Sequence, residues 1–243
     1  MPPLELSRAE LAELLGRGQV EVVGRLRYSS NGAFFVRVCA DGVEVPAVYK
    51  PRRGERPLWD FPDGTLSRRE VAACILSDGL GWDVVPVTVH RDDGPLGEGA
   101  LQRFVEHNPE EHYFTLLESH PDEFRRMAAF DVVINNTDRK GGHCLRATES
   151  GEIFGIDHGV SFHAQWKLRT VIWDFACEPI PPEVCADLHR LADDLRGDLG
   201  DRLVPLLDRF ELDAVNARLG HLLATGEFPD ADRDYHSYPW PTI

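Results

Sequence analysis

The fold of this chain is decided by residues 130–162, which read FDVVINNTDRKGGHCLRATESGEIFGIDHGVSF. The stretch opens with the apolar end of a predicted helix, and a polar loop follows at 135–143. Two short strands are predicted next, at 144–147 and 153–156, because each run is largely apolar and a Thr-Glu-Ser-Gly turn separates them. The stretch therefore predicts a helix, a loop and one small hairpin.

Two acidic residues flank this hairpin. Asp138 lies in the polar loop before it, and Asp157 directly follows its second strand. Because a hairpin brings its two ends together, we expect both carboxylates to face one space. Phosphoryl transfer uses such a pair: one Asp takes the proton of the attacking hydroxyl, and a second Asp, placed after a strand, holds the metal ion. Asp is also common in turns and caps, so the pair is more informative than either residue.

Here the chain resembles a known family. The motif NTDR at 136–139 and the motif IDHGVSF at 156–162 resemble the catalytic and metal loops of the PI3/PI4-kinase-like superfamily. The two motifs are most similar to those of type II phosphatidylinositol 4-kinases, and the chain looks like a member of an actinobacterial family of related proteins. The resemblance implies that Asp138 is the catalytic base and Asp157 a metal ligand. The family pattern has Asn five residues after the base, where this chain has His143.

His143 bears on the choice of metal. A neutral imidazole binds divalent ions, but it suits softer metals than Mg²⁺. We therefore expect ATP with Mg²⁺ or Mn²⁺ as cofactors, with His143 and Asp157 as metal ligands. The same departure keeps a catalytically inactive relative open as an alternative.

The remaining elements fit the same fold. Alternation of apolar and polar residues predicts strands at 19–28, 33–39, 43–49, 84–90 and 99–105. Helices are predicted at 8–18, 68–80, 110–117, 121–134, 183–195, 201–210 and 212–223. We expect an α+β, two-lobed, protein-kinase-like fold, with a small antiparallel-sheet N-lobe, a mostly helical C-lobe and ATP in the cleft between them. The expected boundaries are 1–108 for the N-lobe, 109–228 for the C-lobe and 229–243 for a tail.

Two features of the N-lobe are candidates for binding phosphate. Ser29, Ser30, Asn31 and Gly32 form a turn of small polar residues whose N–H and hydroxyl groups can face phosphate oxygens. Asn-Gly is also the ordinary signal of a hairpin turn. Lys50 ends the third strand, and only two other lysines occur in the chain. The resemblance places the ATP lysine in the same Lys-Pro context.

Glu70 has two interpretations, which the sequence leaves open. In the pattern Ser67-Arg68-Arg69-Glu70, it closes a capping box at the start of its own helix. Alternatively, it pairs with Lys50, as the corresponding glutamate does in kinases. One carboxylate cannot comfortably do both.

Two further segments are expected beside the nucleotide. Loop 52–65 contains proline and glycine and is long for a compact domain, which is typical of a functional flap. The resemblance implies that the backbone of Gln102, Phe104 and Val105, at the hinge after the fifth strand, binds the adenine edge.

Composition excludes several classes of partner. The formal net charge is −15, which argues against nucleic acid and anionic lipid, since both need a basic surface. The chain has no run of eighteen apolar residues and no signal peptide, and its five cysteines are never spaced as CxxC. These features predict a cytoplasmic protein without a membrane partner.

The expected function is ATP- and metal-dependent phosphotransfer to a hydroxyl group of a small molecule or a protein. Transfer of AMP is a related expectation, if the nucleotide binds in the reverse direction. The competing class is a pseudokinase, which binds nucleotide but acts as a regulatory binding module. The expected partners are thus a nucleotide and a hydroxyl acceptor.

Overall fold

The computed structural model describes three ranges of the chain: 6–26, 31–231 and 236–243. Ser29 and Ser30 of the predicted phosphate turn lie outside the described residues. The chain divides into two compact units. The first runs up to Val71 and resumes at Pro86–Val105, and the second comprises Ala72–Val85 and Glu106–Ile243.

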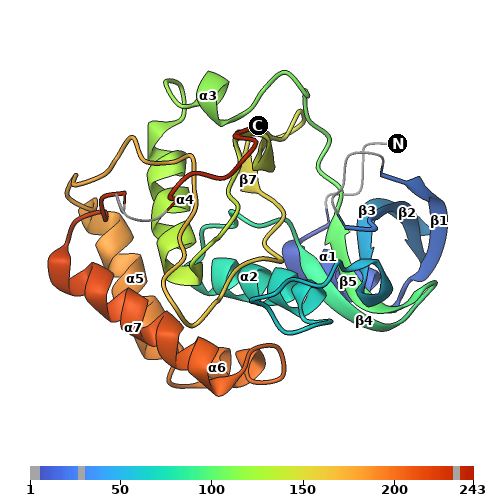
Figure 1. The fold of residues 1–243 in the computed structure, drawn as a ribbon. Helices are drawn as coiled ribbons and strands as arrows, with labels where there is room; N and C mark the ends of the chain where they lie inside the picture. Colours follow the sequence, from blue (N-terminus) through green and yellow to red (C-terminus); the bar gives the residue numbers. More distant parts are fainter. Residues whose placement is uncertain (1–5, 27–30, 232–235) are drawn as a thin grey trace. The chain divides into compact units, whose positions relative to one another are not determined.

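The first unit is an antiparallel sheet with one helix against it (Figure 1). Its strands are β1 (Gln19–Arg25), β2 (Phe34–Ala40), β3 (Val43–Pro51), β4 (Thr88–Gly94) and β5 (Gly97–Arg103), in the order β1-β2-β3-β5-β4. Helix α1 (Arg8–Arg17) begins at Ser7, which forms the predicted capping box with Glu10. Alternate residues of β2 and β3 turn inward, so Val36, Val38 and Tyr49 pack with the leucines of α1. The five-stranded sheet is confirmed.

The predicted capping box at Ser67 is wrong. Helix α2 (Leu66–Leu80) begins before Ser67, so both Ser67 and Glu70 lie inside it. The N–H groups of Leu66 and Ser67 donate instead to the carboxylate of Glu55, over 3.1 and 2.8 Å. The cap comes from the preceding loop rather than from the helix itself, which leaves Glu70 available to Lys50.

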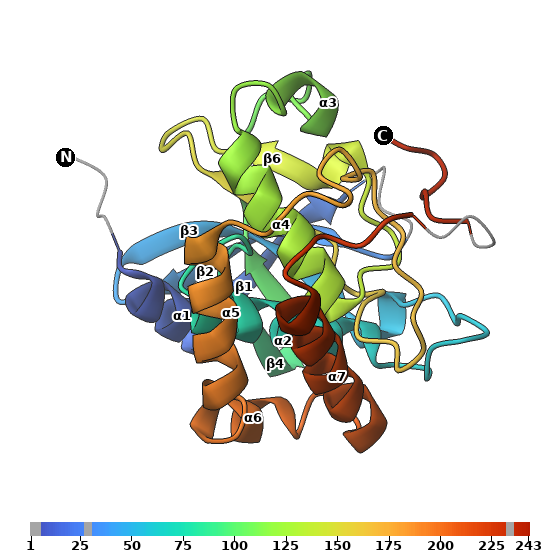
Figure 2. The ribbon, with the colours of Figure 1, turned by 90° about the vertical axis from the view of Figure 1, so that its left-hand side faces the viewer.

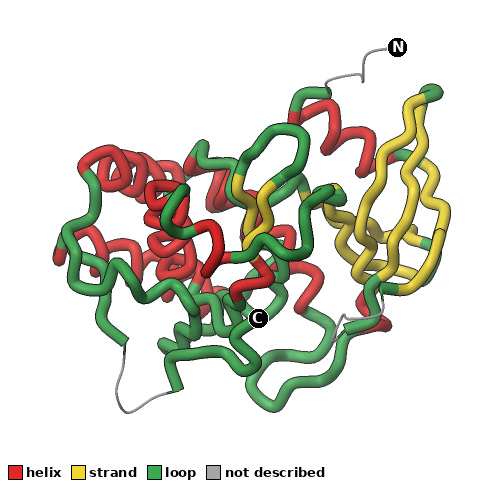
Figure 3. Tube along the Cα trace, turned by 90° about the horizontal axis from the view of Figure 1, so that it is seen from above, coloured by secondary structure: helices red, strands yellow, loops and turns green. Residues whose placement is uncertain are grey.

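The second unit carries a small hairpin and most of the helices (Figures 1 and 2). Its elements are α3 (Tyr113–Leu116), α4 (Pro121–Ile134), β6 (Cys144–Arg146), β7 (Ile153–Gly155), α5 (Pro182–Asp194), α6 (Asp198–Leu203) and α7 (Arg209–Thr225), with the short 3₁₀ turn η2 (Gly141–His143). A second 3₁₀ turn, η1 (Arg52–Gly54), belongs to the first unit. Helix α4 is buried over its whole second half, from Met127 to Ile134, and forms the centre of this core. Figure 3 shows β6 and β7 as a separate pair of short strands.

One predicted helix, at 201–210, is wrong. Helix α6 ends at Leu203, and Pro205 follows in the connection to α7. Asp208 then starts a new helix by accepting from the N–H of Glu211, whose side chain accepts from the N–H of Asp208 in return. This capping box was visible in the sequence, but a continuous leucine stripe masked it.

Among the helices that the structure describes, none combines the length and apolarity that crossing a bilayer needs.

The cap of α2 leads to a stability prediction. Replacing Glu55 with Ala removes two carboxylate oxygens that accept from backbone N–H groups at a helix N-terminus, and we expect a loss of about 1 kcal/mol in the free energy of unfolding. For a chain of this size, that lowers Tm by roughly 2–4 °C in differential scanning calorimetry. Ser67→Ala is the matched control, because no hydrogen bond of its side chain caps the helix. A larger loss in Ser67→Ala than in Glu55→Ala would contradict this account.

Candidate active site

The hairpin brings the predicted metal ligands together. Cys144 pairs with Gly155 in the β6–β7 ladder, and the N–H of Ile156 donates to the carbonyl of His143 over 2.9 Å. The next residue on the β7 side is Asp157, and its Oδ2 lies 3.6 Å from Nε2 of His143. Asp157 has a left-handed backbone, with φ of 62°, a conformation that Asp tolerates better than most residues. The backbone therefore turns sharply where β7 delivers the carboxylate.

This pair fits a divalent ion. Two ligand atoms at about 2.1 Å from a common ion can lie at most about 4.2 Å apart. The 3.6 Å between His143 and Asp157 is within that limit. One imidazole with one carboxylate favours a transition metal such as Mn²⁺ over Mg²⁺, which prefers oxygen ligands alone.

Asp138 lies in the loop before the hairpin, with a lysine against it. Nζ of Lys140 lies 3.0 Å from Oδ2 of Asp138, and both side chains are mostly buried. Burial raises the pKa of Asp138 above its ordinary value, the Lys140 ammonium opposes this, and the charge of Asp157 raises the pKa further. The two acids therefore influence each other electrostatically. A carboxylate with a raised pKa is suited to accept a proton.

A buried ion pair lies beneath these residues. The guanidinium of Arg139 contacts Asp131 of α4 with Nε–Oδ2 at 2.9 Å and Nη2–Oδ1 at 2.8 Å, and neither side chain is exposed. Asn136 joins the pair: its amide donates to Asp131 and its Oδ1 accepts from the N–H of Asp138.

Arg139 also holds the segment that carries Asp157. Its Nη1 donates to the carbonyl of Ile156 over 3.1 Å, and its Nη2 lies 2.7 Å from Nε2 of His158. The ring of His158 packs edge-on against Phe130 of α4. One arginine thus fixes residues on both sides of Asp157.

In the first unit, Lys50 and Glu70 form an ion pair. The side chain of Glu70 is buried, and that of Lys50 is one-fifth exposed. Of the two interpretations of Glu70, the structure shows the pair with the strand lysine. This holds the Lys50 ammonium at the end of β3.

The described part of the predicted phosphate turn, Asn31 and Gly32, contacts loop 52–65. The N–H of Gly32 donates to the carbonyl of Gly54, and Oδ1 of Asn31 accepts from the N–H of Arg56, so this turn is tied to loop 52–65.

At the predicted hinge, Gln102 is buried inside β5, where its side chain donates to Thr88. The N–H of Phe104 donates to the carbonyl of Pro46. This bond continues the pairing one residue past the end of β5 at Arg103, and the adenine-binding role of Gln102, Phe104 and Val105 stays a prediction.

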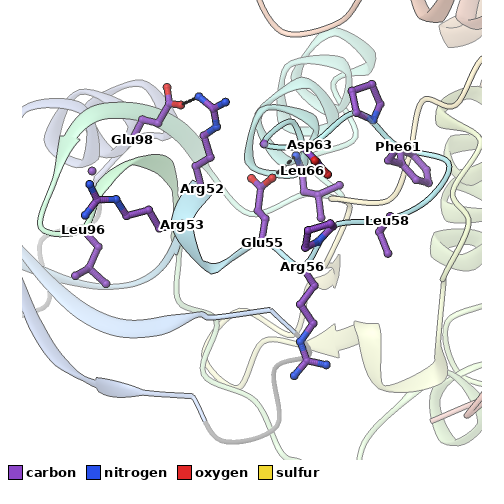
Figure 4. A pocket seen from close by; sticks show the side chains of 14 residues that line it. Arg52, Arg53, Glu55, Arg56, Leu58, Phe61, Asp63, Leu66, Leu96 and Glu98 are labelled. Atoms are coloured by element: carbon purple, nitrogen blue, oxygen red, sulfur yellow. Dashed lines mark hydrogen bonds and ion pairs between the residues drawn. The ribbon is translucent and has the colours of Figure 1, made fainter.

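Loop 52–65 borders a pocket of about 550 Å³ within the first unit (Figure 4). Arg52 crosses it to pair with Glu98, and Glu55 turns toward the start of α2 (Figure 4). Glu98 also lies near His90 and Asp92, a grouping that resembles a metal site. Because Arg52 pairs with Glu98 and lowers its pKa, we interpret this grouping as a surface ion network.

Residues after α7 return to the catalytic loop. The N–H of Gly141 donates to the carbonyl of Thr242 over 2.7 Å, and the carbonyl of Ser237 accepts from Thr170 and from the indole of Trp173. The backbone of this tail therefore packs within the second unit, whereas Trp240 is 89% exposed.

Sequence reasoning missed two residues of this site. Lys140 is one of three lysines and stands two positions after the predicted base, so its rarity was a usable signal. Asp131 lies in the last turn of the helix that leads into the NTDR motif. No local sequence pattern predicts that an acidic residue of this helix is buried. The roles of Asp138, His143 and Asp157 stay predictions, although the structure places all three in one hairpin region.

Comparisons with known proteins agree with this geometry. Residues 82–195 match the model of the family described as phosphatidylinositol 3- and 4-kinase. The chain is 38% identical to protein Rv2133c of Mycobacterium tuberculosis, over 95% of this chain and 94% of that protein.

Two solved structures show the same fold at low identity. A Golgi casein kinase with Mn and ADP bound is 14% identical, with a TM-score of 0.55 over 97% of this chain and 80% of that one. The Helicobacter pylori proinflammatory kinase CtkA is 12% identical, with a TM-score of 0.53 over 88% of this chain and 94% of that one. From the family match, the full-length relative and the kinase fold, this chain belongs to the PI3/PI4-kinase-like superfamily.

Proposed function

We propose that this protein is an ATP- and divalent-metal-dependent phosphotransferase that acts on a hydroxyl group of a small molecule or a protein. The observation that carries the proposal is the hairpin region in which Asp138, His143 and Asp157 lie together. The superfamily supports the reaction class, and the Golgi casein kinase, bound to Mn and ADP, supports the choice of cofactors.

Each residue has a distinct task in this reaction. Lys50, oriented by Glu70, pairs with the nucleotide phosphates as a point charge. Asp157 and His143 hold the divalent ion, which neutralises charge on the phosphates. Asp138 accepts the proton of the attacking hydroxyl, and its raised pKa improves it as a base.

The acceptor is best sought among polar molecules. The net charge of −15 disfavours an anionic lipid surface, despite the family's name. Transfer of AMP instead of phosphate requires only that the nucleotide bind in the reverse direction.

One observation favours a second candidate function. His143 stands where the family pattern has Asn, and a ligand that suits Mg²⁺ poorly would leave a pseudokinase that binds nucleotide without turnover. Incubation with ATP and either Mg²⁺ or Mn²⁺, with ADP, AMP and phosphate measured by chromatography, separates the two. A kinase forms products with at least one metal, whereas a pseudokinase binds ATP and forms none.

Substitutions of Asp157 and Asp138 are expected to affect different properties, namely nucleotide binding and turnover. Wild-type protein at about a hundred times the Kd of metal–ATP should gain about 2.7 kcal/mol, which raises Tm by roughly 5–11 °C. Asp157→Asn should lose this shift, because the metal loses its carboxylate. Asp138→Asn should keep the shift but lose about 10²–10⁴-fold in turnover. Glu149→Gln, in the exposed β6–β7 turn, is the control and should match the wild type. An unchanged shift in Asp157→Asn would remove this residue from the metal site.

His143 is expected to set the metal preference. His143→Asn replaces an imidazole by an amide oxygen, which suits Mg²⁺ better. We expect the ratio of activity with Mg²⁺ to activity with Mn²⁺ to rise by about tenfold, measured as kcat/KM at saturating metal. Equal ratios in the variant and the wild type would show that His143 is not a ligand.

Lys140 is expected to control the pH profile. Activity needs deprotonated Asp138, so it is lost as pH falls through the pKa of that group. The Lys140 ammonium lowers this pKa, and Lys140→Met should therefore move the acid limb of kcat/KM to higher pH. Lys167→Met is the control, because Lys140 and Arg169, rather than Lys167, are the cations with the largest effects on the pKa of Asp138. A limb that stays in place, or that moves to lower pH, would contradict Asp138 as the base.

A further inference from the structure

The second unit contains a cavity that the proposed reaction does not use. Its volume is about 430 Å³, which is in the range of small-molecule sites. Helices α4 and α7, the segment after Phe162 and the residues just beyond α7 form its walls. Apolar side chains dominate the lining, among them Val132, Trp166, Leu222 and Phe228.

One wall of this cavity carries a buried arginine. Arg218 of α7 is only 8% exposed, and it lines the cavity. Its Nε donates to the carbonyl of Val133 over 3.0 Å, and its Nη1 donates to the carbonyl of His163 over 3.2 Å. Its Nη2 is buried, and none of the described residues accepts a hydrogen bond from it. A buried donor in this state costs free energy until an acceptor reaches it.

Arg139 shows what a satisfied buried arginine looks like in this unit. It is fully buried too, but both carboxylate oxygens of Asp131 accept from it. Buried charges are normally paired in this way. Within the described part of the chain, Arg218 has no carboxylate at ion-pair distance. Burial lowers the pKa of Arg218 to about 10 and the charge of Glu211, on the same helix, opposes this effect, so Arg218 still carries its charge at neutral pH.

We propose that this cavity is a binding site for an organic monocarboxylate with an apolar body, whose carboxylate pairs with the guanidinium of Arg218. The apolar lining accommodates the body of the ligand, and the indole of Trp166 offers a flat surface for it. Glu227 and Asp230 also line the cavity, and because their repulsion grows with the charge of the ligand, it opposes a monocarboxylate less than it opposes phosphates and other polyanions.

The position of Arg218 links this site to the catalytic loop. Arg218 donates to the carbonyl of Val133, two residues before Asn135, which caps the end of α4. Arg218 also donates to the carbonyl of His163, and the side-chain amide of Asn135 donates to the same carbonyl. A ligand on Arg218 therefore acts on both segments that carry the catalytic and metal loops, as an effector would.

The test is isothermal titration calorimetry with hexanoate and phenylacetate, against the neutral amides hexanamide and phenylacetamide, at constant ionic strength. We expect at least one carboxylate to bind, with its amide at least tenfold weaker. Ala217→Phe places a ring on the exposed rim of the cavity and should weaken binding at least tenfold. Ala224→Phe adds the same ring at an exposed position of α7 outside the lining and should leave the affinity within twofold.

Arg218→Gln should abolish the preference for carboxylate over amide. Its circular dichroism spectrum is recorded first, because a change at a buried arginine can unfold the unit. If Arg218→Gln is unfolded, the test rests on Ala217→Phe and Ala224→Phe, since both variants leave Arg218 in place. The proposal is overturned if neither carboxylate binds, if the amides bind equally well, or if Ala217→Phe binds like the wild type.

Discussion

The candidate site depends on one buried ion pair, between Asp131 and Arg139. Both side chains are fully excluded from solvent, so neither charge has water to replace its partner. Through that pair, helix α4 fixes the loop that carries Asp138, and the same guanidinium reaches the backbone before Asp157 and the ring after it. Removing either partner leaves an isolated charge in the core, which is far more costly than losing a surface pair.

Two lysines of this acidic protein are also held by carboxylates. Lys50 pairs with Glu70 in the first unit, and Lys140 pairs with Asp138 in the second. Under the proposed function, a nucleotide would have to compete with Glu70 for Lys50. A divalent ion bound with the nucleotide would reduce this competition, because it adds positive charge.

Local patterns predicted a large part of the fold and the core of the site. The capping box at Ser7, the strand alternation and the β6–β7 hairpin all act over a few residues, and the structure has each of them. The hairpin predicted that Asp138 and Asp157 face one space, whereas His143 was predicted as a metal ligand only through the family resemblance; its Nε2 lies 3.6 Å from Oδ2 of Asp157. These features needed no knowledge of distant contacts.

What the sequence could not predict depends on contacts between distant segments. Glu55 caps α2 from a preceding loop, so Ser67 lost that role although its local pattern was favourable. The burial of Arg139 depends on where α4 lies, and local composition carries no information about that. The burial of Arg218 likewise depends on how α7 packs on α4, where its Nε donates to the carbonyl of Val133.

The bond from Gly141 to Thr242 has a consequence for biosynthesis. The catalytic loop leaves the ribosome long before residue 242, with the hairpin, an extended segment and three helices translated in between. Both residues belong to one compact unit, and such units generally fold as a whole. The glycine turn before His143 therefore gains this backbone partner only after residue 242 has been translated.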